Sequence, residues 1–493
     1  MNSAHLNKNS NFVVNIILTA LLIFGLALMP SVITAIKYGD TVCQNIMFAE
    51  SVICILVGYL GSRYFTSDIS SVKPRTCYLA TTITWGIMII LSIIPFYTAG
   101  YGYTIEDSLF EACAGWSTTG ASVIRMDTLP LCLQLWKCTC NWMGGLGIIL
   151  LSVTFIKSWQ FTGQTLVSTE VPGPQFMKST MTFRKSYRRI LGVYTALTLL
   201  QFILLTSFGM PVFRSLETAL SIQSSAGLQH FSVETIIGFS PAIKGIITIF
   251  TIFSSVNLAI FAMLLGGEWR KIVTATELNG AIIIAVISTA LLTCANAIEN
   301  GFGHMIDNLC NSFMQIVSFM STSGYIITDI DGLPEISVVT IAICCIIGAS
   351  AFSTGGGIKV ARFICAMKSI KFGIYRHIHP RIVKTQKYNG VTIANKLILK
   401  SLVYIFLFFS FMIFGALALA ATGADLESSL AAAVAMLTNT GTAINHLGNN
   451  FIYSGYETAA KIIMSILMIG GRLEIYPLLL ILSAGFFRTD KAD

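Results

Sequence analysis

The chain has 493 residues, of which 54% are hydrophobic and only 11% are charged. Soluble domains carry about 25% charged residues. Together with a mean hydropathy of +0.75, this composition excludes a soluble globular protein. The formal net charge of +8 also does not indicate nucleic-acid binding, because the basic residues are confined to short segments between apolar stretches.

Long apolar stretches recur along the chain and predict its fold class. A helix needs ~20 apolar residues to cross a bilayer, and the period-2 strands of a membrane barrel are absent from the sequence. The first stretch is too long for a signal peptide and predicts a retained helix. We therefore expect an all-α polytopic membrane protein. The stretches almost free of charge are residues 12–36, 78–98, 191–209, 245–266, 281–298, 336–352 and 401–421.

Charge alternates between the segments that separate these stretches. Residues 359–400 hold ten Lys or Arg and no acid, and residues 157–189 hold six Lys or Arg against one acid, Glu170. By contrast, residues 299–335 hold five acids and no Lys or Arg, and residues 99–131 hold four acids against one Arg. Basic loops stay on the cytoplasmic side of a membrane. The pattern predicts a cytoplasmic-membrane protein whose basic loops face the cytoplasm.

After two leading spans, at about residues 12–36 and 42–62, the chain repeats one pattern four times. Each unit holds a long span, a short apolar helix, a polar segment with one glycine, and a closing span. Two plus eight spans return both termini to the cytoplasm. The predicted spans of the four units are 76–98 and 133–156, 187–209 and 242–266, 276–298 and 336–370, and 396–421 and 458–486. The predicted domains are 1–70 (two N-terminal transmembrane helices), 71–160 (pore repeat 1), 161–270 (pore repeat 2), 271–394 (pore repeat 3, with an interrupted second helix) and 395–493 (pore repeat 4).

The short helices are too short to span a membrane. About 12 residues of helix reach only ~18 Å, whereas the hydrocarbon core is ~30 Å thick. Each short helix must therefore enter from the acidic side and turn back, and non-helical backbone at that depth is tolerated only beside protein or a water-filled cavity. Four such hairpins in one chain predict a common aqueous axis. The short helices are expected at residues 106–117, 213–224, 305–320 and 425–437.

Small or hydroxyl-bearing residues and then a glycine follow each short helix. Glycine reaches backbone angles barred to other residues, so it lets successive carbonyls point in one direction. Four such segments around an axis would form rings of carbonyls that replace the hydration shell of an ion, and the helix carboxyl ends would favour a cation. One such tripeptide indicates only a turn, but four in equivalent places predict a selectivity filter. The candidate filter residues are Thr118, Thr119, Gly120, Ser225, Ala226, Gly227, Thr322, Ser323, Gly324, Asn439, Thr440 and Gly441.

The four units resemble the Trk/Ktr/HKT superfamily of potassium transporters, over roughly residues 70–490, and the two leading spans favour its TrkH branch. This resemblance implies four helix–pore loop–helix repeats around a central pore, potassium as the transported ion, and no bound prosthetic group. The residue after each glycine varies and departs from a strict pattern (Ala121, Leu228, Tyr325 and Thr442). The further stretches that carry the resemblance are residues 142–147, 170–174, 353–360 and 471–475.

The third closing span holds Gly355-Gly356-Gly357, which cost roughly 3 kcal/mol relative to alanine in a helix and predict a break. A packing kink or an ordinary helix end is one interpretation, and the resemblance implies an intramembrane gate. Arg472, at membrane depth, either pairs with a polar neighbour or projects into the ion path, where it would form a barrier to cations and bond the carbonyls of the Gly355–Gly357 loop. The candidate gate residues are Ser353, Thr354, Gly355, Gly356, Gly357 and Arg472.

The resemblance also implies partners. Residues 368–396 serve as an orientation signal or, by resemblance, as part of a docking face for a cytosolic TrkA-type nucleotide-binding regulatory subunit. The other cytoplasmic stretches, with Glu170, residues 184–189 and residues 268–271, would share that face. Homodimerisation is implied in the same way. Membrane lipid surrounds the spans, and no nucleic-acid partner is expected.

Two other classes of function compete with this interpretation. A secondary transporter coupled to sodium or protons would carry inverted repeats, whereas these units all point the same way. A polytopic membrane enzyme would need clustered carboxylates or histidines with a metal or phosphate site. The twelve cysteines are scattered and predict small buried hydrophobes, not a metal cluster. The acids expected to line a solvated outer vestibule are Glu106, Asp107, Glu111, Asp329 and Asp331.

Overall fold

In the computed structural model, helices account for nearly all regular structure, which confirms the all-α prediction. The structure describes residues 2–65, 74–160, 183–264, 267, 269–301, 304–328, 333–379, 386–389, 391–392, 395–443, 453–475 and 479. The motif at residues 170–174, Glu268, Asp329 and Asp331 lie outside the described residues. The domain limits given above stay predictions.

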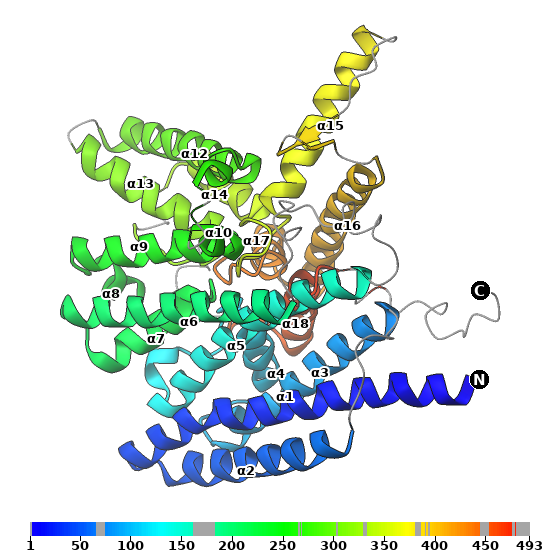
Figure 1. Cartoon of the computed structure of the whole chain (residues 1–493). Coiled ribbons are helices and arrows are strands. Elements are labelled where there is room, and N and C mark those ends of the chain that lie inside the picture. The colour runs from blue at the N-terminus through cyan, green and yellow to red at the C-terminus, as the bar shows by residue number, and fades with distance from the viewer. Residues whose placement is uncertain are drawn as a thin grey trace.

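Helices α1 (Asn2–Tyr38) and α2 (Thr41–Tyr64) form an antiparallel hairpin along one flank of the molecule (Figure 1). The turn uses Gly39 in the left-handed region, and the Asp40 side chain caps α2 by accepting a hydrogen bond from Cys43 N–H. The two helices approach closely at Gly58, where an added Cβ would lie 2.5 Å from the backbone nitrogen of Leu22. Small residues at such a crossing let helices pack in lipid without a hydrophobic driving force.

Each repeat begins with a long helix and a short one. The short helices begin and end within one residue of their predicted limits, because Thr104 and Asp425 cap two of them through their side chains and a serine or threonine follows all four. The pairs, in chain order, are α3 (Pro74–Thr98) with α4 (Ile105–Trp116), α6 (Phe183–Ser207) with α7 (Val212–Gln223), α12 (Thr276–Asn300) with α13 (Met305–Met320), and α16 (Asn395–Ala420) with α17 (Leu426–Leu437).

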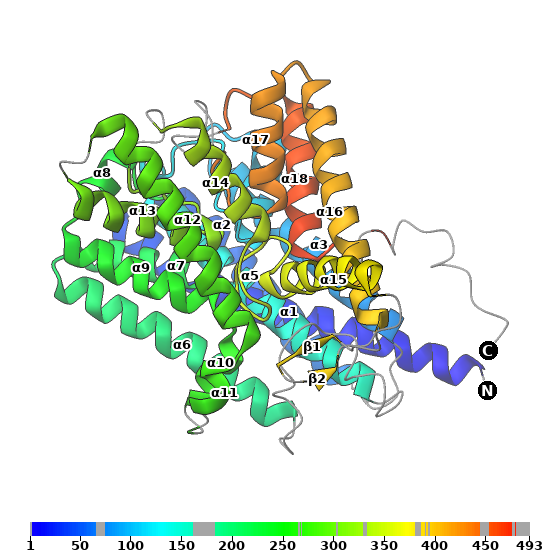
Figure 2. The ribbon, with the colours of Figure 1, turned by 90° about the horizontal axis from the view of Figure 1, so that it is seen from above.

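The second helices of the repeats differ from one another. In repeat 1, α5 (Leu131–Gln160) is continuous. Repeat 2 has α9 (Pro241–Ser255), an extended residue Val256, and then α10 (Leu258–Leu264). Repeat 3 has α14 (Glu335–Ile347), a loop from Gly348 to Lys359, and α15 (Val360–Ile378), which projects from the bundle (Figure 1). In repeat 4, α18 (Thr458–Arg472) lies beside α16 and α17 (Figure 2).

The predictions of continuous closing spans at 242–266 and 458–486 are therefore wrong. The first breaks at Val256 and the second ends at Arg472, where Glu474 and Ile475 adopt left-handed backbone angles. The expected break in repeat 3 is confirmed, but it extends over residues 348–359 and not only over the three glycines. Tertiary contacts cause these interruptions, because the residues at each break form hydrogen bonds with another repeat, as described below.

Six helices in the described part of the chain are long and apolar enough to cross a membrane. They include both N-terminal helices and the first helix of every repeat, so the protein is a multi-pass membrane protein. The remaining regular elements are short: η2 (Met126–Thr128), α8 (Val233–Ile237), α11 (Trp269–Val273), and an antiparallel strand pair of β1 (Lys387–Tyr388) and β2 (Val391–Thr392). The candidate spans are Asn11–Tyr38, Thr41–Tyr64, Leu79–Thr98, Arg189–Ser207, Thr276–Glu299 and Leu397–Ala420.

Candidate cation-binding site

The segments after the four short helices share one backbone conformation. In each, the second residue after the helix adopts a positive φ although it is not glycine, and the glycine two residues later also has a positive φ. This region is sparsely populated, and a β-branched threonine there is an outlier. Its recurrence at four equivalent places shows a conformation that the fold imposes. The φ values are 57° at Thr118, 60° at Ser225, 62° at Thr322 and 57° at Asn439, and 75°, 81°, 66° and 78° at Gly120, Gly227, Gly324 and Gly441.

The backbone N–H groups of these segments point back at their own short helix. In repeat 1, Thr118 N–H donates to Gly115 O at 3.1 Å and Thr119 N–H donates to Ala114 O at 3.0 Å. The same pair of bonds recurs in the other repeats. The donors there are Ser225 (3.0 Å) and Ala226 (2.9 Å), Thr322 (3.0 Å) and Ser323 (2.9 Å), and Asn439 (3.2 Å) and Thr440 (2.9 Å).

The carbonyl groups of the same residues are left without donors. Within the described residues, no hydrogen bond ends on the carbonyl oxygen of either residue before each glycine. All eight residues are at most 1% exposed. A buried carbonyl without a partner costs free energy, so more than 90% of such groups in native proteins are paired. These eight carbonyls make the segments a candidate site for a cation. They belong to Thr118, Thr119, Ser225, Ala226, Thr322, Ser323, Asn439 and Thr440.

Contacts at the glycines show how the four segments are arranged. A Cβ added to Gly120 would lie 2.0 Å from Ala226 O of repeat 2, and one added to Gly441 would lie 1.9 Å from Thr119 O of repeat 1. A Cβ on Gly324 would lie 2.4 Å from Thr440 O of repeat 4.

Repeats 2 and 3 are in contact next to Gly324. The Tyr325 hydroxyl, directly after Gly324, donates to Thr251 Oγ1 of α9 at 3.1 Å. The segments therefore lie next to one another in the order of the chain and close into a ring that brings all twelve candidate filter residues together.

Hydroxyl groups that were expected to line the site are largely engaged elsewhere. Thr119 Oγ1 shares a hydrogen bond with Ser117 Oγ at 2.6 Å, and Thr440 Oγ1 shares one with Thr438 Oγ1 at 2.8 Å. Ser323 Oγ accepts from Ser321 Oγ at 3.0 Å. Thr119 Oγ1 also accepts from Asn439 Nδ2 of repeat 4 at 3.0 Å. The segments thus present backbone carbonyls, while these hydroxyls brace the loops and, at Thr119, join repeats 1 and 4.

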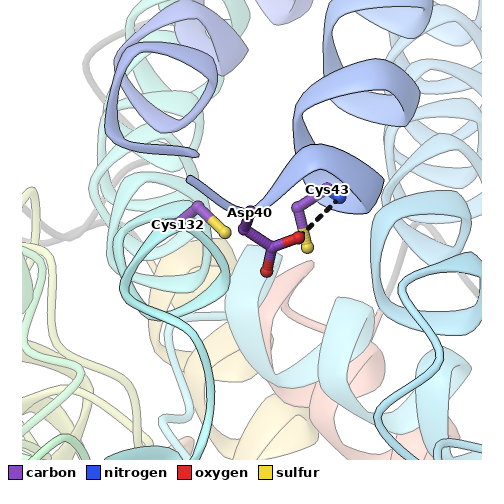
Figure 3. Close-up of side chains that lie close together, drawn as sticks. All are labelled: Asp40, Cys43 and Cys132. Carbon is purple, nitrogen blue, oxygen red and sulfur yellow. Dashed lines mark hydrogen bonds between the residues drawn. The ribbon is translucent and has the colours of Figure 1, made fainter. Parts of the chain in front are cut away.

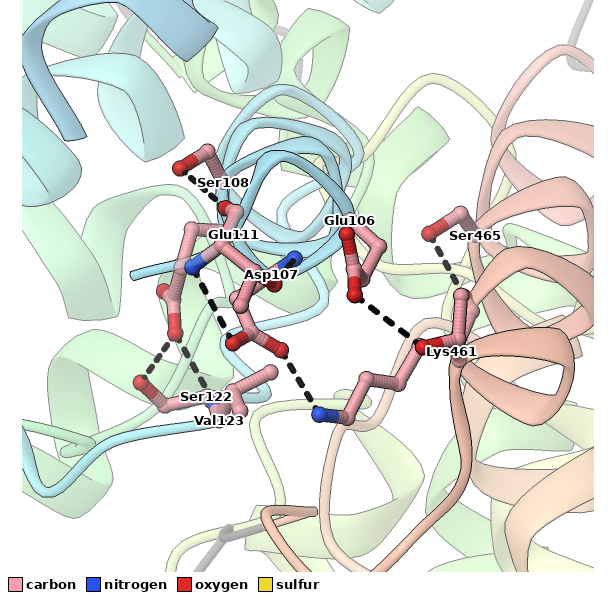
Figure 4. Close-up of polar contacts among 10 residues, drawn as sticks. Glu106, Asp107, Ser108, Glu111, Ser122, Val123, Lys461 and Ser465 are labelled. Carbon is pink, nitrogen blue, oxygen red and sulfur yellow. Dashed lines mark hydrogen bonds and ion pairs between the residues drawn. The ribbon is translucent and has the colours of Figure 1, made fainter. Parts of the chain in front are cut away.

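Behind the repeat 1 segment lies a buried ion pair that the sequence analysis did not predict. Glu111 and Lys137 are both fully buried and paired at 2.5 Å. Lys137 Nζ also donates to Ala121 O at 2.7 Å. Glu111 Oε1 accepts from Ser122 Oγ and Val123 N–H, each at 2.7 Å (Figure 4). This network fixes the residues that follow Gly120. The signal available in the sequence was a lysine inside an otherwise apolar span.

The prediction that Glu111 and Asp107 line a solvated vestibule is therefore wrong. Glu111 is 0% exposed and Asp107 is 7% exposed. Asp107 pairs with Lys461 of α18 at 2.7 Å and thereby links repeats 1 and 4 (Figure 4). Glu106 is half-buried and accepts a hydrogen bond from Thr458 at 3.0 Å. Asp107 and Glu106 are paired within the bundle because α18 packs against α4 and brings Lys461 and Thr458 to them, while Glu111 is paired by Lys137 of α5.

In repeat 3 a neutral side chain, Gln315, holds the residues that follow the glycine. Gln315 precedes Ser321 by six residues, as Glu111 precedes Ser117. Its Oε1 accepts from the backbone N–H groups of Ile327 at 2.9 Å and Thr328 at 3.4 Å. An acceptor at this helix position therefore holds the chain after the glycine in two repeats, ionised in one and neutral in the other.

The loop from Gly348 to Lys359 lies against the ends of the short helices. Gly356 N–H donates to Thr322 Oγ1 at 2.7 Å, and Thr354 Oγ1 shares a hydrogen bond with Ser225 Oγ at 2.8 Å. A Cβ on Gly356 would lie 2.0 Å from Thr438 O. The loop thus touches the segments of repeats 2, 3 and 4 directly at the residues that begin the ring.

The backbone N–H and carbonyl groups at the breaks in repeats 2 and 3 form hydrogen bonds with each other. Ser350 N–H donates to Ser255 O at 3.0 Å and Thr354 N–H donates to Ser254 O at 3.3 Å, so carbonyls at the end of α9 serve the loop. In return, Leu258 N–H at the start of α10 donates to Phe352 O at 3.3 Å. In addition, the buried Glu277 accepts from Ala351 N–H at 2.6 Å. Irregular backbone at membrane depth is tolerated when protein groups satisfy it in this way.

Arg472 is 3% exposed and reaches across the loop. Its Nη1 donates to Thr354 O at 2.6 Å and its Nη2 donates to Gly144 O of repeat 1 at 3.2 Å. The expected partners were the carbonyls of Gly355–Gly357, so the bond falls one residue earlier in the loop. The structure thus brings the six candidate gate residues together below the ring, with Lys359 Nζ donating to Gly355 O as a second cationic contact.

Comparison with known proteins agrees with this arrangement. A profile of the TrkH family, described as "Cation transport protein", matches residues 43–281 and 272–487. The chain belongs to the TrkH family. Relatives within it include the "Trk system potassium uptake protein TrkH" of Salmonella typhimurium, 28% identical over 84% of this chain and 86% of that protein, and "TrkG" of Escherichia coli, 26% identical over 95% and 96%.

The fold of the TrkH family is also seen in a solved structure. The potassium transporter TrkH from Vibrio parahaemolyticus superposes with a TM-score of 0.85, over 97% of this chain and 99% of that one, at 23% identity. This likeness supports the polytopic all-α fold with its four repeats. The family description, "Cation transport protein", places the chain among transport proteins.

The Glu111–Lys137 pair yields a stability prediction. Lys137→Met leaves Glu111 as an unpaired buried charge, which costs about 3–5 kcal/mol, and we expect a clear loss of thermal stability in detergent. The double variant Glu111→Gln/Lys137→Met imitates the neutral acceptor Gln315 and should recover most of that loss. Thermal unfolding of purified protein measures both. A double variant as unstable as Lys137→Met alone would contradict the assigned role of Glu111 as an acceptor.

Proposed function

We propose that this TrkH-family protein mediates potassium uptake across the cytoplasmic membrane, with the ion stripped of water by the ring of carbonyls. The observation that carries the proposal is the set of eight buried carbonyls, two from each repeat, that have no donor among the described residues. Four segments with two carbonyls each supply eight oxygens (4 × 2), arranged as two rings of four. Such rings are the means by which potassium filters replace a hydration shell.

The electrostatics of the ring favour a monovalent cation. All four short helices end at it, and a helix carboxyl end carries about half a negative charge. The ring itself holds no carboxylate, because Glu111 is paired with Lys137 behind it. Neutral dipoles attract a weakly hydrated cation without holding it permanently, as conduction requires.

The assignment of potassium as the transported ion rests on the names of relatives. The Salmonella and Escherichia coli relatives are called potassium uptake proteins, and potassium is the ion that we assign to this chain. It is the transported substrate and not a resident cofactor. The variable residue after each glycine, Ala121, Leu228, Tyr325 or Thr442, borders the ring and would set how strictly sodium is rejected.

Gating is assigned to the loop of residues 348–359 with Arg472. The loop lies where an ion leaving the ring would pass, and a buried guanidinium there opposes the passage of cations through its charge. Hydrogen bonds from Arg472 to Thr354 O and Gly144 O hold the loop in the closed position. Opening would require those bonds to break and the loop to withdraw along the seam with α9 and α10.

The proposed topology puts the basic segments and both termini in the cytoplasm. Helix α15 and the following strand pair then project into the cytoplasm, where residues 368–396 would receive a TrkA-type nucleotide-binding subunit. A homodimer completes the proposed assembly. The alternative function is secondary transport coupled to sodium or protons, and the first experiment below separates the two.

Rubidium uptake into proteoliposomes of the purified protein tests the proposal. We expect uptake driven by a set membrane potential and unchanged when a pH or sodium gradient is imposed, because a carbonyl filter needs no coupled ion. Empty liposomes are the control. Uptake that follows the pH or sodium gradient would establish the coupled transporter instead, and absence of uptake under every condition would remove the transport proposal.

The ring glycines should set ion preference. Gly120→Ser and Gly324→Ser place a Cβ within 2.4 Å of a neighbouring carbonyl oxygen and so must displace the ring. We expect the preference for rubidium over sodium to fall several-fold in the uptake assay. Gly100→Ser is the matched control, because Gly100 also has a positive φ but has nothing within 4 Å of its added Cβ. Unchanged preference in both ring variants would show that the ring is not the filter.

Removing the Arg472 charge should raise flux. Arg472→Ala frees Thr354 O and Gly144 O and removes a positive charge below the ring, so the rate of rubidium uptake should increase several-fold. Arg472→Lys keeps the charge but cannot bridge both carbonyls with a planar fork. Its rate of rubidium uptake should therefore lie between those of the wild type and Arg472→Ala. Equal uptake rates in all three proteins would exclude a gating role for this residue.

A further inference from the structure

Away from the ring, three side chains with metal-binding atoms converge where α1 turns into α2. They are Asp40, the cap of α2; Cys43, in its first turn; and Cys132, at the start of α5. The carboxylate oxygen and the two sulfur atoms all lie within 4.8 Å of one another. Figure 3 shows Asp40 between the two cysteines, with the three side chains directed toward a common point.

The three residues come from two parts of the fold. Asp40 and Cys43 belong to the N-terminal hairpin, while Cys132 begins the second helix of repeat 1. Cys132 lies five residues before Lys137, which holds the carbonyl of Ala121 beside the ring. A ligand shared by the three groups would therefore fasten the hairpin to the scaffold of repeat 1.

The Asp40 carboxylate is already oriented. Its Oδ1 accepts from Cys43 N–H at 3.0 Å and its Oδ2 accepts from the Tyr101 hydroxyl at 2.8 Å. These two hydrogen bonds fix the direction of the carboxylate. A carboxylate has about four lone-pair sites, so two remain for another partner. Outer-shell donors of this kind are what fix ligands in metal sites.

The two thiols select the class of ion. Both are nearly inaccessible, at 1% and 2% exposure. Two sulfur ligands and one carboxylate suit a thiophilic divalent ion such as Zn²⁺, with metal–sulfur distances of about 2.3 Å and metal–oxygen distances of about 2.0–2.2 Å. In tetrahedral geometry these lengths place the sulfur atoms about 3.8 Å apart, which fits within the observed spacing. Alkali and alkaline-earth ions prefer oxygen-only sites and are disfavoured.

We propose that Asp40, Cys43 and Cys132 form a binding site for a thiophilic divalent cation of the zinc class, which fastens the N-terminal hairpin to repeat 1. Three protein ligands leave a fourth position for water, as in open zinc sites. Both thiols lose their protons when the ion binds, so binding tightens as pH rises. The site is separate from potassium passage and does not depend on the proposed function.

Zinc binding to purified, reduced, full-length protein tests this inference. We expect one cysteine-dependent zinc per chain by elemental analysis after gel filtration, and a rise of the thermal midpoint by at least about 2 °C on adding zinc. Cys43→Ser and Cys132→Ser should each abolish both effects. Cys294→Ser and Cys310→Ser, which change two exposed cysteines outside the cluster, should retain them. A wild-type gel-filtration profile and an unchanged thermal midpoint without zinc show that the variants are folded.

A second readout needs no variant. Co²⁺ in place of Zn²⁺ should give the intense charge-transfer absorption of thiolate ligands in the wild-type protein, and this absorption should be lost on adding excess Zn²⁺. Absence of that absorption would overturn the proposal. So would mass spectrometry of unreduced protein that finds Cys43 joined to Cys132 by a disulfide, because a disulfide leaves no thiolate for a metal.

Discussion

The structure depends on eight backbone carbonyls that are buried and that no group in the described part of the chain donates to. Burial without a partner is unfavourable for each of them. The fold tolerates it because the matching N–H groups are bonded to the short helices and because positive φ angles at residues such as Thr118 and Asn439 turn the carbonyls away from those helices. The re-entrant helices, the glycines without Cβ atoms and the closed order of the repeats all serve this one arrangement.

A single chain of unequal repeats supports that arrangement in four different ways. Behind the segment of repeat 1 is a buried ion pair, and behind that of repeat 3 is a neutral glutamine. In repeat 2, Thr218 and His230 share a hydrogen bond at 3.1 Å, and in repeat 4 the Tyr453 hydroxyl donates to Gly441 O at 2.9 Å. Tyr453 N–H also donates to Ser122 O at 2.8 Å and so joins repeat 4 to repeat 1. A chain without symmetry can adjust each quarter of the ring separately.

The differences among the repeats also account for the loop of residues 348–359 below the ring. Only repeat 3 contributes the segment of residues 348–359, and only repeat 4 contributes the arginine that holds it. The loop and the break between α9 and α10 exchange hydrogen bonds, so each interruption satisfies the other. The loop also has hydrogen-bond partners in the segments of repeats 2 and 3, and Arg472 of repeat 4 donates to it.

The sequence by itself determined the polytopic helical class and the limits of the short helices, and it singled out the twelve residues that the structure brings together. Apolar length, charge alternation and a recurring glycine are local signals, and membrane thickness converts them directly into structure. The sequence could not show that α9 and α18 end early, because those breaks are stabilised by hydrogen bonds to other repeats. It also misplaced Glu111 and Asp107 in solvent, because their partners Lys137 and Lys461 lie 26 and 354 residues away along the chain. Nor could it bring Cys43 beside Cys132, since cysteine spacing along the chain carries no information about helices that meet only in three dimensions. Tertiary packing decided every contact in which a charge, a thiol or a broken helix found its partner in another part of the chain.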